Sequence, residues 1–125
     1  MDRVNPMSAS IVGKTIPHIC VRRPAASDVP DVAALFSEMQ RHYHRPVSDE
    51  QAKAAAEVAC APCVAIFDPR VLIALADGAI VGSIVMNVAF PAYELTRALY
   101  IRDLYVARSM RRHRVGQMLV RAAPE

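Results

Sequence analysis

The feature that most constrains the fold is a succession of three patterns near the C-terminus of the 125-residue chain. Residues 98–106 are rich in apolar and aromatic side chains, which favours a strand. Residues 108–114, called the basic turn below, hold four arginines and a histidine. Apolar side chains then recur at the spacing of one helix face, at Val115, Met118, Leu119 and Ala122. We therefore predict a buried strand that leads through a basic turn into an amphipathic helix.

A β-hairpin is predicted immediately upstream. Residues 71–76 and 80–88 are apolar runs of strand length, and Asp77-Gly78 between them is a strong signal for a tight turn. Gly82, inside the second run, is a candidate for a β-bulge.

The N-terminal half predicts one strand and two helices. Residues 16–23 are typical of a short strand that ends before a proline. Apolar residues at helical spacing between positions 29 and 43 predict a helix capped by Ser27, and Ser48 with Gln51 forms a capping box for a second helix. Residues 1–15 show no periodicity and are expected to be a flexible tail. Residues 16–125 then form one α+β domain, in three layers, with the order β-α-α-β-β-β-α.

Composition is compatible with one globular domain. The apolar fraction is 54% and the charged fraction 22%, enough to bury a core. No apolar run reaches the roughly 18 residues that span a bilayer, and the N-terminus has no signal-peptide pattern. We therefore expect a cytoplasmic protein without a membrane partner.

The cysteines do not predict a disulfide framework or a metal site. There are three, and Cys60 and Cys63 form a CxxC pair at the end of the second predicted helix. A redox CxxC begins a helix, where the helix N-terminus lowers the thiol pKa. A zinc site with His42 and His44 matches no common spacing. Small buried or loop cysteines are the expected outcome.

Charge is concentrated near the basic turn. Residues 97–121 contain seven arginines and a single acid, Asp103. A strand that enters a helix through such a turn directs free amides and the helix dipole at one point, which suits an anion. Gly116 would let the backbone approach a bound group closely. A nucleotide phosphate, a nucleic acid or an acidic partner would all qualify, and an ordinary connection with a solvated basic surface is equally compatible with the residues alone. The sequence has neither a P-loop nor a GxGxxG fingerprint.

Residues 111–116 resemble motif A of the GCN5-related N-acetyltransferases (GNAT), whose phosphate loop has the pattern [Q/R]-x-x-G-x-[G/A]. Arg111 takes the first position and Gly116 the last, whereas Arg114 replaces the first glycine. A positive φ would strain the backbone of Arg114. The resemblance extends over residues 16–123, with the predicted hairpin as the family's second and third strands and residues 100–106 as its fourth. It implies an acyl-CoA N-acyltransferase-like mixed sheet that lacks the last strands and helix of the family.

The resemblance implies an acetyl-CoA-dependent N-acetyltransferase that acts on a small amine by direct transfer. The diphosphate would lie on the amides of residues 112–117, and the pantetheine along the outer edge of the fourth strand. The expected cofactor-binding residues are Leu104, Tyr105, Val106, Arg111, Arg112, His113, Arg114, Val115, Gly116 and Gln117. Transfer would rely on proximity, on a strand amide that polarises the thioester carbonyl, and on a base.

The acceptor side is predicted from a few side chains. Asp103 is the only carboxylate inside the motif strand and the candidate catalytic residue, although we favour an ion pair with Arg102 or Arg97. Polyamine acetyltransferases carry a similar Y-L-E-D stretch, with a glutamate at the position of Arg102. Tyr43 and Glu94 are the candidate substrate-binding residues, from the end of the first helix and the loop before the strand.

Two other functions are compatible with the sequence. One is a non-catalytic acyl-CoA-binding or regulatory domain. The other is a nucleic-acid-binding module built on the arginines, which few aromatic residues and no helix-turn-helix spacing support. The chain stops before the family's remaining strands, so the fourth strand would leave a sheet edge open to pairing with a second copy, as in a dimer.

Overall fold

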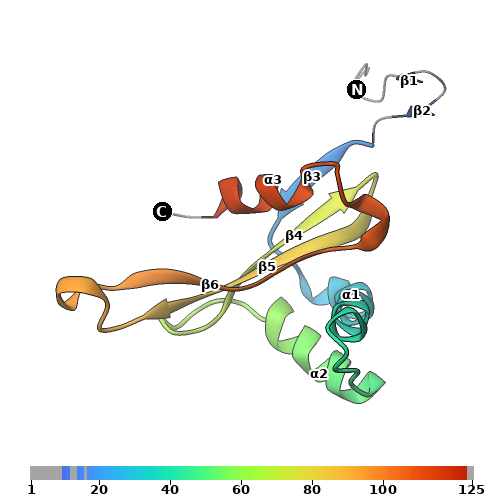
Figure 1. Cartoon of the computed structure of the whole chain (residues 1–125). Coiled ribbons are helices and arrows are strands. Elements are labelled where there is room, and N and C mark those ends of the chain that lie inside the picture. Colours follow the sequence, from blue (N-terminus) through green and yellow to red (C-terminus); the bar gives the residue numbers. More distant parts are fainter. Residues whose placement is uncertain (1–9, 12–13, 16, 124–125) are drawn as a thin grey trace.

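The computed structural model describes residues 10–11, 14–15 and 17–123 (Figure 1). After a short antiparallel pair, β1 (Ser10–Ile11) with β2 (Lys14–Thr15), the chain forms β3 (Ile19–Arg22), α1 (Val29–His42), α2 (Asp49–Cys60), β4 (Arg70–Ala76), β5 (Ala79–Ala89), β6 (Ala98–Val106) and α3 (Val115–Ala122). Single 3-10 turns precede α1 (Ala26–Asp28), join β5 to β6 (Tyr93–Leu95) and follow β6 (Arg108–Met110). The predicted order from the first long strand to the last helix is confirmed. The rest of the predicted tail lies outside the described residues.

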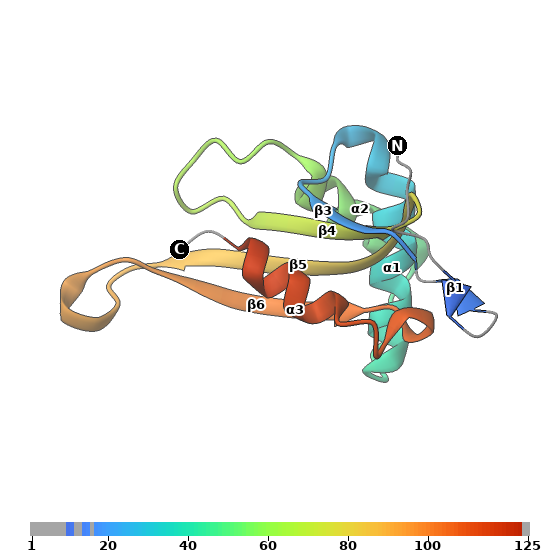
Figure 2. The ribbon, with the colours of Figure 1, turned by 90° about the horizontal axis from the view of Figure 1, so that it is seen from above.

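Four strands form one sheet in the order β3-β4-β5-β6. Helices α1 and α2 pack against one face of the sheet and α3 against the other, which gives three layers (Figures 1 and 2). All three pairings are antiparallel, so the described strands contain no parallel pairing of the expected mixed sheet.

The core lies on both faces of the sheet. Helix α1 buries an apolar stripe, Val32, Leu35, Phe36 and Met39, on one face. Val115 and Leu119 of α3 are buried on the other, at 1% and 0% exposure. The burial of these apolar side chains is the main force that holds the helices on the sheet.

The hairpin turn forms as predicted. Asp77 and Gly78 have φ of 48° and 88°, and two positive φ values are the mark of a type I′ turn. The bulge, however, is not at Gly82. Gly82 pairs with Ala74 and Ile80 pairs with Leu75, so the extra residue is Val81.

Gly82 instead allows α3 to lie close to the sheet. A Cβ built on Gly82 would lie 3.2 Å from a methyl carbon of Val115, 3.2 Å from the carbonyl oxygen of Tyr105 and 3.3 Å from a methyl carbon of Leu119. Close approach of a helix, and not a bulge, therefore explains the glycine.

A second bulge interrupts β6. Val85 pairs with Asp103 and Met86 pairs with Ile101, so Arg102 is the residue without a partner. Because a bulge bends its strand and redirects side chains, it decides how Arg102 and Asp103 are presented.

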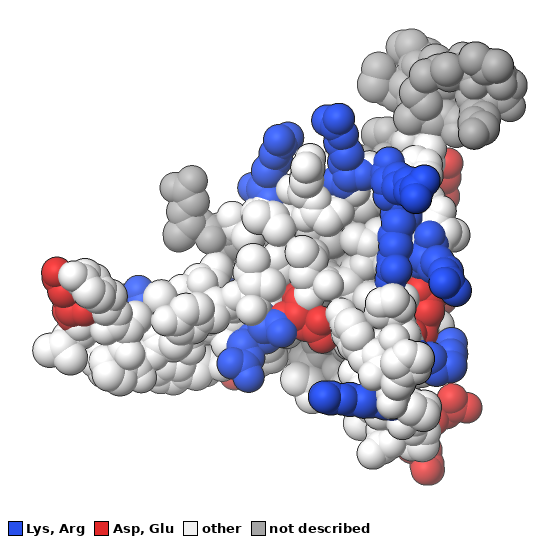
Figure 3. Space-filling view, viewed as in Figure 1, with Lys and Arg blue, Asp and Glu red and all other residues white. Residues whose placement is uncertain are grey.

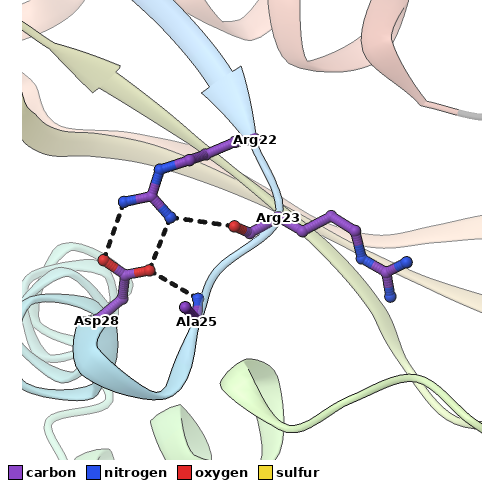
Figure 4. A network of polar contacts seen from close by, with 4 residues as sticks. All are labelled: Arg22, Arg23, Ala25 and Asp28. Carbon is purple, nitrogen blue, oxygen red and sulfur yellow. Dashed lines mark hydrogen bonds and ion pairs between the residues drawn. The ribbon is translucent and has the colours of Figure 1, made fainter.

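The start of α1 differs from the prediction. Ser27 lies inside the preceding 3-10 turn, and α1 begins after Asp28. The Asp28 carboxylate accepts hydrogen bonds from the amide of Ala25 at 2.7 Å and from the guanidinium of Arg22 at 2.8 and 3.1 Å (Figure 4). The Arg22 guanidinium, followed by the Ala25 amide, lowers the pKa of the Asp28 carboxyl.

The start of α2 is as predicted. The Ser48 hydroxyl accepts from the Gln51 amide at 3.1 Å, and the Gln51 side chain accepts from the Ser48 amide at 2.9 Å. Within the described residues, no helix combines the length and apolar character needed to cross a membrane.

Candidate functional site

The basic turn leaves a run of backbone amides without partners. The amides of Met110 and Arg111 donate to carbonyl oxygens within the turn, at 2.9 and 3.4 Å, and the amide of Met118 donates to Arg114 at 3.1 Å. Between them, no amide of residues 112–117 makes a well-aligned hydrogen bond in the part of the chain that the structure describes, although residues 111–114 form a turn. These are the same amides that the sequence assigned to the diphosphate. Such a run of free donors at a helix start is suited to binding an anion.

Two arginines of this turn adopt a left-handed backbone. Arg112 has φ of 73°, and Arg114, which immediately precedes α3, has φ of 61°. Arg114 is the residue that replaces the first glycine of the motif, so the backbone keeps a geometry that favours glycine. For a residue with a Cβ, this conformation costs about 1–2 kcal/mol.

Gly116 lies in the first turn of α3 with open space beside it. A Cβ built there would contact only a methyl group of Val106, at 3.8 Å. There is therefore room beside the Cα of Gly116, and close approach of a bound group to this backbone stays a prediction.

The arginines of the basic turn differ in their surroundings. Arg111 folds back, since its Nε donates to the carbonyl oxygen of Val106 at 3.2 Å and its guanidinium lies 5.4 Å from the ring centre of Tyr105. Arg112 and Arg114 are exposed. Lys and Arg side chains gather over α3 and the adjoining turn (Figure 3).

Tyr105 was expected at the cofactor, but its side chain lies under α1. It is 3% exposed, and its hydroxyl donates to Glu38 at 2.5 Å. The same carboxylate oxygen accepts from the amide of Arg108 at 3.2 Å. Burial and the Glu38 carboxylate raise the pKa of Tyr105 to about 12. Tyr105 therefore anchors the basic turn to α1 through Glu38, a residue that the sequence analysis did not identify.

Two candidate acceptor residues come together beside the β6 bulge. A hollow of about 450 Å³, called the β6 hollow here, is lined by Gln40, Tyr43, Arg45, Arg102 and Asp103. Tyr43 comes from the end of α1 and Asp103 from β6, as the sequence placed them. Glu94 is separate, because it lies in the 3-10 turn at the tip of the long β5–β6 hairpin, which projects from the domain (Figures 1 and 2).

Asp103 is a partly buried carboxylate without a cation. Among the described residues it forms no ion pair, so the favoured ion pair with Arg102 or Arg97 is wrong. Burial raises the pKa of the Asp103 carboxyl. A carboxylate in this state is better suited to accept a proton than an ordinary surface aspartate.

An adjacent hollow of about 370 Å³ is lined by Glu38, Arg41, His42, Tyr105 and Arg108. The rings of His42 and Tyr43 lie 5.8 and 6.3 Å from that of Tyr105. Both hollows thus border the C-terminal half of α1, and neither is lined by the free amides of the basic turn.

Cys60 and Cys63 lie where the sequence placed them, whereas Cys20 is exposed on β3 and is therefore neither buried nor in a loop. Cys60 ends α2 and is buried, which raises the pKa of its thiol, and Cys63 is in the loop that follows. Within the described ranges no three potential ligand side chains gather around one point.

The architecture defines an acyl-CoA N-acyltransferase-like fold, and solved structures share it. An integron cassette protein from the mobile metagenome of V. cholerae matches with a TM-score of 0.63 and 22% identity, over 82% of this chain and 64% of that one. A possible acetyltransferase from Clostridium difficile 630 matches with a TM-score of 0.68 and 12% identity, over 82% and 66%. AAC(6')-Iy in complex with the bisubstrate analogue CoA-S-monomethyl-acetylneamine matches with a TM-score of 0.62 and 17% identity, over 84% and 68%. The chain therefore spans just under two thirds of the length of the first two structures.

The family model of the acetyltransferase (GNAT) family matches residues 32–125, which is well over half of the chain. The chain belongs to the GNAT family. A search of the curated proteins found no match.

Proposed function

We propose that this chain binds acetyl-CoA through the basic turn and transfers the acetyl group directly to an amine. The observation that carries the proposal is the run of unpartnered amides at residues 112–117, next to the exposed Arg112 and Arg114. Amide and guanidinium donors are the groups that proteins use to bind phosphate oxygens.

The pantetheine is proposed to lie along the free edge of β6. The amide of Ala107 donates to the carbonyl oxygen of Val81 at 2.7 Å, so Ala107 directs its polar backbone toward β5. Because backbone direction alternates along an antiparallel strand, Leu104 and Val106 direct theirs to the other edge. That edge has no partner among the described strands, although Arg111 already binds the Val106 carbonyl. The Val106 amide remains for the cosubstrate, whereas the Leu104 amide also interacts with the Asp103 carboxylate and lowers the pKa of that carboxyl against the larger effect of burial.

Acetyl-CoA supplies an activated thioester. The amine nitrogen forms a bond to the acetyl carbon, the carbon–sulfur bond breaks, and the sulfur leaves with coenzyme A. We assign to Asp103 the proton released by the amine, and to Tyr43 a wall of the acceptor site. The elevated pKa of the Asp103 carboxyl is consistent with this role.

Calorimetric titration with acetyl-CoA and with acetyl-pantetheine, which lacks the diphosphate, tests the assignment. We expect acetyl-CoA to bind at least about tenfold more tightly, since several charge-assisted hydrogen bonds are made to the diphosphate. Arg112→Gln with Arg114→Gln should remove most of that difference. Arg121→Gln, an exposed arginine near the end of α3, is the matched control. Equal affinities for the two compounds would contradict the proposal.

Thiol release from acetyl-CoA in the presence of amines separates an enzyme from a binding domain. Turnover that falls on Asp103→Asn supports the transferase. Binding of acetyl-CoA without turnover on any amine supports the non-catalytic acyl-CoA-binding alternative. We further propose a cytoplasmic location and a homodimer formed across the free edge of β6 in the part of the strand that precedes Leu104, which leaves Leu104 and Val106 to the cosubstrate.

A further inference from the structure

The β6 hollow combines charges of both signs that do not neutralise each other. Its lining residues include Asp103, which carries a carboxylate, and Arg45 and Arg102, which carry guanidinium groups. Neither arginine forms an ion pair with Asp103 or with any other residue that the structure describes. All three charged groups are therefore available to a ligand.

The β6 bulge is what places two of these charges next to each other. Arg102 has no partner on β5, whereas Asp103 pairs with Val85. Without the extra residue, consecutive residues of the strand would alternate between the two faces of the sheet. Here Arg102 and Asp103 line one hollow, together with Arg45 from the segment after α1.

This charge pattern discriminates between classes of amine. A primary ammonium group can pair with Asp103. The second ammonium of a polyamine would meet Arg102 and Arg45 and be repelled, whereas a carboxylate on the same molecule would meet two forked donors. The two guanidinium groups would thus repel a polyamine and attract an amine that also carries a carboxylate.

We propose that the acceptor is a zwitterionic amine of the amino-acid type, which carries a carboxylate in addition to the primary amine, and not a polyamine. The inference rests on the proposed function, and assigns Arg102 and Arg45 to recognition of the carboxylate and Asp103 to the amine. It also gives the bulge a role in substrate selection.

Matched pairs of compounds that differ only by one carboxylate test the proposal. L-ornithine and putrescine form one pair, and L-lysine and cadaverine a second. Each compound is titrated by calorimetry into the full chain saturated with coenzyme A. The carboxylated member of each pair should have a dissociation constant at least about tenfold lower than that of its diamine. Equal or tighter binding of the diamine, or binding of neither member, would overturn it.

Charge reversal at the bulge gives a second measurement. Arg102 is exposed and makes no described hydrogen bond, so Arg102→Glu should fold with an unchanged midpoint of thermal unfolding. We expect it to reverse the preference toward putrescine, whereas Arg121→Glu should retain the preference for L-ornithine. An unchanged preference in Arg102→Glu would refute the role of this arginine.

The affinity of each variant and of the wild-type chain for acetyl-CoA, measured separately, distinguishes a failure of the acceptor assignment from a failure of the proposed function. Loss of the ornithine preference with acetyl-CoA binding intact overturns the acceptor assignment alone. Failure of the wild-type chain to bind acetyl-CoA overturns the proposed function itself.

Discussion

The carboxylate of Glu38 accepts a hydrogen bond from the buried hydroxyl of Tyr105 at 2.5 Å and connects two segments 67 residues apart. The same oxygen accepts from the amide of Arg108, where the basic turn begins. Glu38, a residue of α1, therefore attaches the start of the basic turn to this helix.

Removal of this carboxylate is expected to destabilise the fold. Glu38→Ala leaves the Tyr105 hydroxyl and the Arg108 amide without their acceptor, which should lower the free energy of unfolding by about 1–3 kcal/mol. Glu38→Gln retains an acceptor oxygen and should lose less. Urea denaturation measures both, with Glu57→Ala, an exposed glutamate of α2, as control. A Glu38→Ala variant as stable as the control would show that the contact is not stabilising.

One tyrosine is expected to titrate abnormally late. The pKa of Tyr105 is raised to about 12, so its ionisation should appear as a late step in an absorbance titration of the folded chain. The folded state retains the proton that the unfolded chain loses near pH 10, so stability should fall between about pH 10 and 12. Tyr105→Phe should abolish the late step. A late step that persists in Tyr105→Phe would assign it to another group.

Relief of backbone strain is expected to stabilise the chain at Arg114. Arg114→Gly should raise the free energy of unfolding by about 1 kcal/mol, since a left-handed φ of 61° costs a glycine no side-chain clash. Arg121→Gly, inside α3, should have the opposite sign, because glycine disfavours a helix interior. Thermal and urea unfolding compare the two. Destabilisation by Arg114→Gly would mean that its side chain stabilises the turn more than the strain costs.

Acid is expected to remove the contribution of Asp28. Because the folded-state pKa of this carboxyl is lowered, its stabilising contribution is present above the unfolded value and is lost as pH falls through the folded value. Wild type should therefore exceed Asp28→Asn in unfolding free energy by the largest amount near neutral pH. This difference should become smaller as the pH falls below about 4. Denaturation curves at a series of pH values measure it. A constant difference down to pH 2 would show that ionisation is not involved.

The free edge of β6 is expected to support self-association. Tyr100 and Ile101 are 52% and 49% exposed on this strand. Ile101→Lys adds a charge to the edge, a device that disfavours strand pairing, and should shift sedimentation velocity profiles toward the monomer. Val58→Lys, at an exposed apolar residue of α2, is the control. A wild-type chain that remains monomeric at all concentrations would exclude the homodimer.

Features encoded by neighbouring residues were predictable from the sequence. The Asp77-Gly78 turn, the Ser48–Gln51 capping box and the boundaries of β6 all depend on contacts within a few residues, and the structure has them where the patterns indicated. The unpartnered amides of residues 112–117 follow from a similarly local passage of strand, turn and helix.

Features that depend on distant contacts were not predictable. The contact between Glu38 and Tyr105 joins residues 67 positions apart, so the spacing of apolar residues along the sequence does not indicate it. Arg102 became the unpaired residue of β6 through its register with β5, which no local propensity determines. The position of Glu94 in the loop before the strand makes it a candidate substrate-binding residue, yet the length of the hairpin places it away from Asp103. Ser27 and Asp28 are both common helix caps, and Asp28 is the one anchored because Arg22 and the amide of Ala25 both donate to its carboxylate.

The missing side chain of Gly82 has a mechanical consequence. Because Gly82 has no side chain, Val115 and Leu119 of α3 pack directly against the backbone of β5. No side-chain atoms of residue 82 lie between the helix and the strand that could move to accommodate a change in either. The first turn of that helix also carries the amides proposed to hold the cosubstrate. A methyl group added at Gly82 would therefore displace α3, and with it the turn that is proposed to hold the diphosphate.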